Sequence, residues 1–207
     1  MTMKNIKLVA FDCDGVMFET AQANRFYYSD ILQHFGRPAL TEEQFRFVHM
    51  HTVHESMAYL FSDGSLLEAA RAFRNTMDYR KYLSYHTVEP QLVPLLGKLR
   101  PQIKTAIATN RTDTIERLLA EFDLDGYFDL VISSSDVQRP KPHPDALLKI
   151  LDHFGLAPHQ AIYIGDSQVD ELAARAAKMP LVAYRNRELE ADFYINNLGE
   201  IEKLLNI

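Results

Sequence analysis

Short apolar segments that alternate with helical patterns are the feature that most constrains how this chain can fold. Most of these segments are rich in Val, Ile and Ala and lack strict apolar–polar alternation, so we expect strands that are buried on both faces. Helical periodicity separates the last four segments, and strands that alternate with helices form parallel sheets. The predicted fold class is therefore α/β with a parallel sheet, whose strands correspond to residues 6–11, 105–109, 130–133, 161–165 and 181–183.

The stretch from about Val16 to Tyr85 interrupts this alternation and contains no convincing strand. It is too long for a loop, and an apolar stripe at residues 27, 31 and 35 indicates a helix. Three further helices are predicted to begin at capping boxes, in which a Ser or Thr precedes a Glu or Gln by three positions. The stretch is therefore interpreted as an all-helical insert, with capping boxes at Thr41 and Gln44, Thr52 and Glu55, and Ser65 and Glu68.

The composition excludes several classes of protein. A net charge of −6 gives no general attraction to nucleic acid or to anionic lipid. The only cysteine is Cys13, so no disulfide can form within the chain, and we expect its side chain to be buried. The chain contains no apolar run of the length that spans a membrane and opens with no signal sequence. We expect a cytoplasmic protein that binds neither nucleic acid nor membranes.

Two carboxylates follow the first predicted strand directly, at Asp12 and Asp14. Residues two positions apart on an extended chain point the same way, and ligands of parallel sheets bind at this carboxyl edge. Close carboxylates repel each other unless a cation or a shared proton joins them, and Mg²⁺ prefers oxygen ligands. The alternative is an acidic turn after a buried strand, for which Gly15 would permit the tight bend.

Three other polar groups follow the ends of later strands. Asp166 and Asp170 lie four residues apart, so both can face one site, although Asp166 or Ser167 could simply cap a helix. Thr109 and Asn110 follow the second strand and could bind phosphate or cap a helix. Lys141 follows the third strand between prolines, where it could point inward or remain a solvated loop residue. The convergence of these groups at one sheet edge favours a functional site.

Asp12-Cys13-Asp14-Gly15-Val16, Thr109-Asn110, Lys141-Pro142 and Gly165-Asp166-Ser167-x-x-Asp170 resemble, in this order, the four motifs of the haloacid dehalogenase superfamily in its phosphatase branch. The resemblance covers essentially the whole chain, and the insert is similar to the first-type helical cap. Phosphoglycolate-phosphatase-like and β-phosphoglucomutase-like members have the most similar pattern. The resemblance implies a Rossmann-like core at residues 1–15 and 87–207, with helices on both faces of the sheet, and a cap domain at 16–86.

The resemblance also implies a Mg²⁺-dependent phosphomonoester hydrolase that acts on a small phosphorylated metabolite. Asp12 would form an aspartyl-phosphate, and Asp14 would act first as an acid and then as a base. The presence of this second acid disfavours dehalogenation. The remaining implied roles concern the metal and the phosphate. Mg²⁺ would be held by Asp12, Asp166 and the backbone carbonyl of Asp14. The phosphoryl oxygens would be bound by Thr109, Asn110 and Lys141, and Asp170 would orient Lys141 or a metal-bound water.

Substrate specificity is harder to predict, because it depends on the insert. His49 and His51 occupy a position similar to the specificity loop of related caps, and either could contact the substrate. Surface exposure or packing within the insert is the alternative. His49, His51 and His54 do not have the spacing of a strong metal site.

Two other functions remain as alternatives. A β-phosphoglucomutase-like phosphomutase would need a bisphosphorylated sugar to prime Asp12. A receiver-type phosphoacceptor module would carry its aspartate after the third strand, where this chain has Ser133, Ser134 and Ser135. We expect either a monomer or a homodimer.

Overall fold

The computed structural model describes residue 3 and residues 5–207. Its main sheet consists of β1 (Leu8–Phe11), β4 (Lys104–Ala108), β5 (Leu130–Ile132), β6 (Ala161–Gly165), β7 (Leu181–Tyr184) and β8 (Phe193–Ile195). These six strands are all parallel and follow the order β5-β4-β1-β6-β7-β8. The five predicted strands are present, so the predicted α/β fold class is confirmed.

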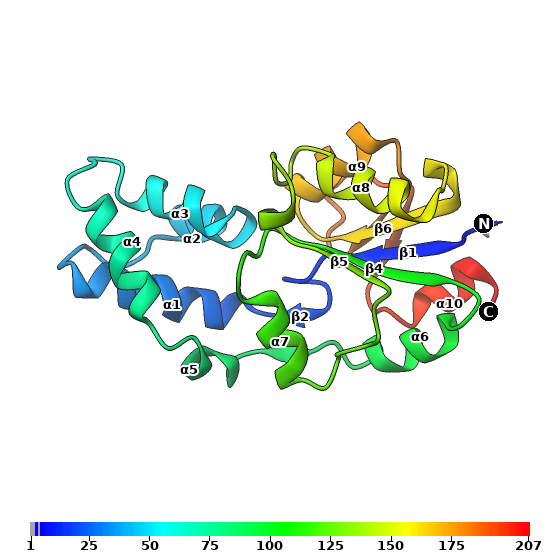
Figure 1. Ribbon diagram of the computed structural model, residues 1–207, viewed down its shortest axis with the longest axis horizontal. Helices are drawn as coiled ribbons and strands as arrows, with labels where there is room; N and C mark the ends of the chain where they lie inside the picture. Colours follow the sequence, from blue (N-terminus) through cyan, green and yellow to red (C-terminus); the bar gives the residue numbers. More distant parts are fainter. Residues whose placement is uncertain (1–2, 4) are drawn as a thin grey trace.

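Helices cover both faces of this sheet (Figure 1). Val9 and Phe11 of β1 pack with α6 (Leu92–Leu99), α7 (Ile115–Glu121) and α10 (Glu200–Leu205). Leu8 and Ala10 point to the opposite face and pack with α8 (Asp145–Phe154) and α9 (Gln168–Ala177). All four side chains are fully buried, which explains why the strand reads as a continuous apolar run.

The insert consists of helices and has an apolar core of its own. Its elements are α1 (Ala21–His34), α2 (Glu42–Met50), α3 (Val53–Leu60), α4 (Leu67–Thr76) and the short α5 (Arg80–Leu83). In Figure 1, α1 to α4 lie to one side of the sheet, beyond the carboxyl end of β1. This placement puts the insert over the edge that carries the predicted site. The division at residues 16–86 stays a prediction.

Two of the three predicted capping boxes are present. Thr41 caps α2 and Thr52 caps α3, each with the reciprocal bond from the third residue of its helix. The box predicted at Ser65 is wrong, because α4 begins after Leu66 without a side-chain cap. The backbone N–H and hydroxyl of Ser65 instead donate to Asp63 Oδ1, at 3.3 and 3.2 Å. The polar groups of Ser65 therefore stabilise a local turn and do not cap the helix.

Three short strands were not predicted. β2 (Phe18–Glu19) and β3 (Thr87–Val88) form an antiparallel ribbon where the chain leaves and re-enters the core. The expectation of no strand between about Val16 and Tyr85 is wrong, because β2 lies within that stretch. β8 extends the edge of the main sheet beside β7. Two or three residues are too few to show a periodic pattern. Two 3₁₀ turns, Ser134–Asp136 and Pro158–Gln160, complete the elements.

Cys13 is fully buried against the apolar core, as predicted. Among the described residues, no helix has both the length and the apolar character needed to cross a membrane.

Candidate active site

The strand order brings the predicted site residues together. Asp12 follows β1, and its backbone N–H donates to the Ile164 carbonyl of the neighbouring β6 at 2.8 Å. Thr109 follows β4 on the other side of β1, and Asp166 follows β6. Three of the four sequence motifs therefore lie at the carboxyl ends of three adjacent strands.

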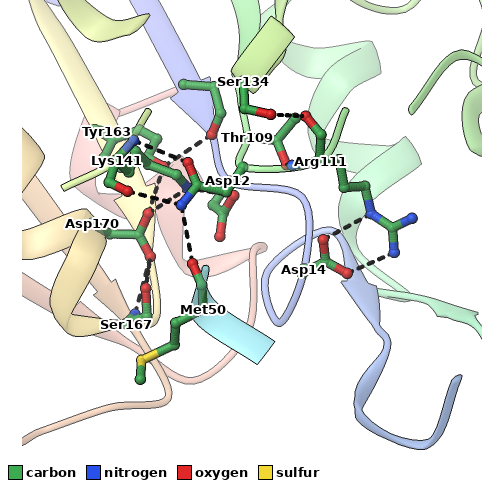
Figure 2. A network of polar contacts seen from close by, with 12 residues as sticks. Asp12, Asp14, Met50, Thr109, Arg111, Ser134, Lys141, Tyr163, Ser167 and Asp170 are labelled. Carbon is green, nitrogen blue, oxygen red and sulfur yellow. Dashed lines mark hydrogen bonds and ion pairs between the residues drawn. The ribbon is translucent and has the colours of Figure 1, made fainter. Parts of the chain in front are cut away.

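Lys141 joins this edge from the segment after β5 and is almost completely buried. Its ammonium donates to Asp12 Oδ1 at 2.7 Å, to Asp170 Oδ1 at 2.7 Å and to the Tyr163 hydroxyl at 2.9 Å. Figure 2 shows these contacts converging on one nitrogen. All three N–H donors are used, so the interpretation of Lys141 as a solvated loop residue is wrong.

Asp170 combines two functions in the structure. One oxygen accepts from Lys141, while the other accepts the Ser167 backbone N–H at 3.1 Å, at the start of α9. Burial opposes ionisation of this carboxyl, but the contacts with Lys141 outweigh it and lower its pKa. Asp170 therefore both caps the helix and orients the lysine.

Tyr163 belongs to this cluster but was not predicted. It lies within β6, fully buried, and its hydroxyl is 2.7 Å from Asp170 Oδ1 and 3.1 Å from the Ala108 carbonyl. A tyrosine in the middle of the aliphatic segment Ala161–Gly165 was the available signal, because a buried hydroxyl needs a partner.

A cation fits beside Asp12 and Asp166. Carboxylate oxygens of Asp12, Asp166 and Asp170 lie within 4.8 Å of one another, and theirs is the one such acidic or histidine group in residues 3 and 5–207. Three carboxylates against the single Lys141 ammonium leave two negative charges. Gly15 allows this approach, because a Cβ there would lie 2.1 Å from Asp166 Oδ2. The donor set, all oxygen with an excess of negative charge, matches a hard divalent cation.

The carboxyl groups of this cluster show the strain of like charges. Burial, followed by repulsion from Asp170, raises the pKa of Asp12 to about 7 despite the neighbouring lysine. Burial and the charges of Asp170 and Asp12 also raise the pKa of Asp166 well above its usual range. A bound cation would relieve this cost by favouring the ionised forms.

Asp14 faces a different partner from Asp12. Both carboxylates line the same cavity, but the chain turns after β1, and of the two only Asp12 contacts Lys141. Asp14 instead pairs with Arg111, with both N–O distances at 2.7 Å (Figure 2). Burial opposes ionisation of Asp14, but the guanidinium outweighs it and lowers its pKa to about 2. Arg111 was not predicted as a site residue, although it directly follows Thr109-Asn110.

Asn110 connects the core to the insert. Its side-chain amide donates to the Met50 carbonyl at 3.0 Å and to the Lys141 carbonyl at 2.9 Å, while its side-chain oxygen accepts the Lys141 N–H at 3.0 Å. Thr109 is buried, and its hydroxyl accepts the Arg111 backbone N–H at 3.1 Å. The Asn110 side chain thus joins the end of α2 to the backbone of Lys141.

A cavity of about 570 Å³ lies between the core and the insert, lined by Asp12, Thr109 and Asp166 from the core. His49 and His51 line its other side. His49 Nδ1 is 3.0 Å from the Asn24 side-chain nitrogen, and burial lowers its pKa. His51 stacks on Phe47 with ring centres 3.9 Å apart. His54 lies on α3.

Tyr79 also lines this cavity, and its hydroxyl contacts Arg111. Of the neighbouring tyrosines, Tyr82 is buried in the core of the insert and Tyr85 is largely exposed.

The raised pKa of Asp12 makes stability dependent on pH. Since the pKa is about 7 in the folded chain against an ordinary 3.8, its contribution to stability is complete below about pH 4 and is lost as pH rises through about 7. In chelator, we expect the unfolding free energy of wild type minus that of Asp12→Asn to fall between pH 5 and 7, by up to about 1.4 kcal/mol per pH unit. Urea titrations measure this difference, in which histidine titration cancels. A constant difference would contradict the prediction.

Comparisons with known proteins agree with this geometry. A family model described as haloacid dehalogenase-like hydrolase matches residues 9–184. A phosphoglycolate phosphatase of Chromobacterium violaceum is 30% identical over 222 aligned residues, covering 99% of both chains. A haloacid dehalogenase-superfamily hydrolase of subfamily IA from Geobacter sulfurreducens, solved by crystallography, is 38% identical, with a TM-score of 0.79 over 99% of this chain and 100% of that one.

A crystal structure of β-phosphoglucomutase from Clostridium difficile shares the fold, with a TM-score of 0.82 at 19% identity over 97% of each chain. The resemblance seen in the four motifs is confirmed. The chain belongs to the haloacid dehalogenase-like hydrolase family.

Proposed function

We propose that this chain is a Mg²⁺-dependent phosphatase that hydrolyses a small phosphorylated metabolite through an aspartyl-phosphate on Asp12. The observation that carries the proposal is the buried cluster at the sheet edge, where Lys141 holds Asp12 at 2.7 Å and Asp166 lies across Gly15. A buried ammonium holds the Asp12 carboxylate in place. A divalent cation would balance the two negative charges that remain in the cluster, so that this carboxylate could attack an anionic phosphate.

Asp12 is the proposed nucleophile. One of its oxygens is occupied by Lys141, and the other would form the new bond to phosphorus as the bond to the leaving oxygen breaks. Water would then attack the same phosphorus, and the bond to Asp12 would break to release inorganic phosphate. Covalent catalysis divides one slow displacement into two faster steps.

Asp14 is the proposed acid and base. It would donate a proton to the leaving oxygen in the first step and take a proton from water in the second. Its ionised form, paired with Arg111, is the state that accepts a proton. To donate in the first step, Asp14 would first take up a proton from solvent on one oxygen, while its other oxygen stays hydrogen-bonded to Arg111.

Thr109, Asn110 and Lys141 are the proposed phosphate-binding residues. Thr109 lines the cavity beside Asp12, and Lys141 supplies the positive charge. The side-chain donors of Asn110 are occupied by the Met50 and Lys141 carbonyls. Its amide would bind phosphate only after it releases one of them.

Asp12, Asp166 and the backbone carbonyl of Asp14 would hold the metal. Bound Mg²⁺ would neutralise the repulsion between nucleophile and phosphate and stabilise charge on the phosphoryl oxygens. Asp170 would act on this site through Lys141, which it contacts at 2.7 Å.

The cavity is large enough for a small metabolite, at about 570 Å³. His49 and His51 are proposed to contact the end of the substrate remote from the phosphate, because both line the wall opposite Asp12. The Chromobacterium violaceum relative is named phosphoglycolate phosphatase, which makes 2-phosphoglycolate the first compound to test. We propose a cytoplasmic monomer or homodimer without nucleic-acid or membrane partners.

Magnesium should stabilise the folded chain. A ligand at 100 times its dissociation constant contributes about 2.7 kcal/mol, so we expect saturating Mg²⁺ to raise the melting temperature by roughly 5–10 °C. Asp166→Asn should abolish this shift, whereas the control Asp152→Asn, at an exposed position on α8, should retain it. Differential scanning calorimetry checks both. An equal shift in Asp166→Asn would place the cation elsewhere.

Hydrolysis of an aryl phosphate tests the reaction itself. Asp12→Asn keeps the size of the side chain but removes the nucleophile, so turnover of p-nitrophenyl phosphate should fall by roughly 10³-fold or more. Chelator should abolish wild-type turnover, and added Mg²⁺ should restore it, while Asp152→Asn behaves as wild type. Full activity of Asp12→Asn, or of wild type in excess chelator, would end the proposal.

A further inference from the structure

The Arg111 guanidinium uses every one of its five N–H donors. Two go to Asp14, as described above. The other three go to the Tyr79 hydroxyl at 2.8 Å, the Thr114 hydroxyl at 3.2 Å and His86 Nε2 at 3.1 Å. The Arg111 side chain is only 7% exposed. So complete a set of partners fixes both the position and the orientation of the guanidinium plane.

The tautomer of His86 supports this set of contacts. Its Nδ1 lies 3.0 Å from the Tyr82 carbonyl, which can only accept, so Nδ1 carries the proton. Nε2 is then free to accept from Arg111. Burial, together with the charge of Arg111, lowers the pKa of His86 and keeps the ring neutral.

The five donors connect two parts of the chain. Asp14 and Thr114 belong to the sheet edge, whereas Tyr79 and His86 belong to the return segment, defined here as residues 77–86, between α4 and β3. Tyr79 also lines the cavity and packs edge-on against Tyr27 of α1. Arg111 is therefore a side chain through which a movement of the return segment would reach Asp14.

We propose that Arg111 is a positioning residue, which orients the Asp14 carboxylate and links it to the return segment through Tyr79 and His86. The inference rests on the proposed phosphatase function, because it assumes that Asp14 acts on the leaving oxygen and the attacking water. The planar fork of arginine fixes a carboxylate in two directions at once, which an ammonium cannot do. Because proton transfer depends on such placement, the effect of Arg111 on turnover must pass through Asp14.

A double-mutant cycle with Asp14→Asn tests this dependence, with 2,4-dinitrophenyl phosphate as substrate. We expect Arg111→Met to lower kcat by about tenfold or more, with KM changed by less than about twofold. In the Asp14→Asn background, the same substitution should change kcat by less than about twofold. Equal losses in both backgrounds would show that Arg111 acts on the substrate directly, and would overturn the proposal.

A comparison of leaving groups gives a second readout. An aryl leaving group departs without a proton, whereas an alkyl leaving group needs one, so loss of Asp14 positioning penalises alkyl phosphates most. We expect Arg111→Met and Arg111→Lys both to raise the ratio of aryl to alkyl phosphate turnover, by about tenfold for Arg111→Met. An unchanged ratio would contradict the proposal, even if Asp14→Asn is too slow to measure.

Arg74→Met is the matched control. Arg74 also joins insert and core, through Asp113 at 2.6 Å, and contacts Tyr27 within the insert at 2.9 Å, but it has no contact with Asp14 among the described residues. Its effect on kcat should be the same in the wild-type and Asp14→Asn backgrounds, and it should leave the aryl-to-alkyl ratio unchanged. A rise in that ratio equal to that of Arg111→Met would assign the effect to any contact between insert and core, and would overturn the proposal.

Tyr79→Phe covers the case in which Arg111→Met fails to fold. It keeps the ion pair and removes the hydroxyl contacts with Arg111 and His86. A smaller rise in the aryl-to-alkyl ratio is therefore expected, and no rise would contradict the link to the return segment. Failure of this inference is distinct from failure of the proposed function. If the double-mutant cycle is additive but Mg²⁺-dependent turnover is still lost in Asp12→Asn, the inference about Arg111 fails and the proposed phosphatase function remains.

Discussion

The site depends on one buried ammonium. Lys141 donates to a carboxylate at the end of β1, to a carboxylate at the start of α9 and to a hydroxyl within β6. Without that charge, Asp12, Asp166 and Asp170 would face one another unopposed in a buried volume. Removing one partner of a buried ion pair typically costs about 3–5 kcal/mol, so the architecture of the sheet edge and its chemistry rest on the same contacts.

The second charged pair, Asp14 with Arg111, is built on different terms. The two charges of this pair cancel, so no cation is needed to balance them. The low pKa of Asp14 contrasts with the raised pKa of Asp12 two residues away. Environment alone separates the two carboxylates, since burial opposes ionisation of both. In the proposed mechanism, Asp12 is the nucleophile beside the cation site, and Asp14 carries the proton beside Arg111.

The insert meets the core through polar contacts around the cavity and through Leu83 of α5, which packs into the apolar core of the sheet. Asn110 binds the Met50 carbonyl, and Arg74 pairs with Asp113 across the same gap. Because the insert has an apolar core of its own, these contacts can form or break without disturbing either core. Substrate recognition and access of water to the site can therefore depend on a small number of bonds.

The sequence predicted the features that arise from continuous patterns. The strands could be predicted because β1, β4 and β6 are buried on both faces and are therefore continuously apolar. The site could be predicted because the carboxyl ends of parallel strands meet at one edge of the sheet. The contacts of Arg111, Tyr163 and Asn110 could not be predicted, because they depend on which groups lie within 3 Å of them across 22 to 97 positions of chain. The capping box at Ser65 failed for a local reason, since Asp63 offered a nearer acceptor.

A crystal structure of the chain with Mg²⁺ and beryllium trifluoride would test the chemistry most directly, since this fluoride mimics a phosphoryl group on a carboxylate. The expected result is a trifluoride bound to Asp12, with one Mg²⁺ held by Asp12, Asp166 and the carbonyl of Asp14. A trifluoride on any other side chain, or a cation bound away from Asp166, would contradict the proposed nucleophile and the proposed metal site.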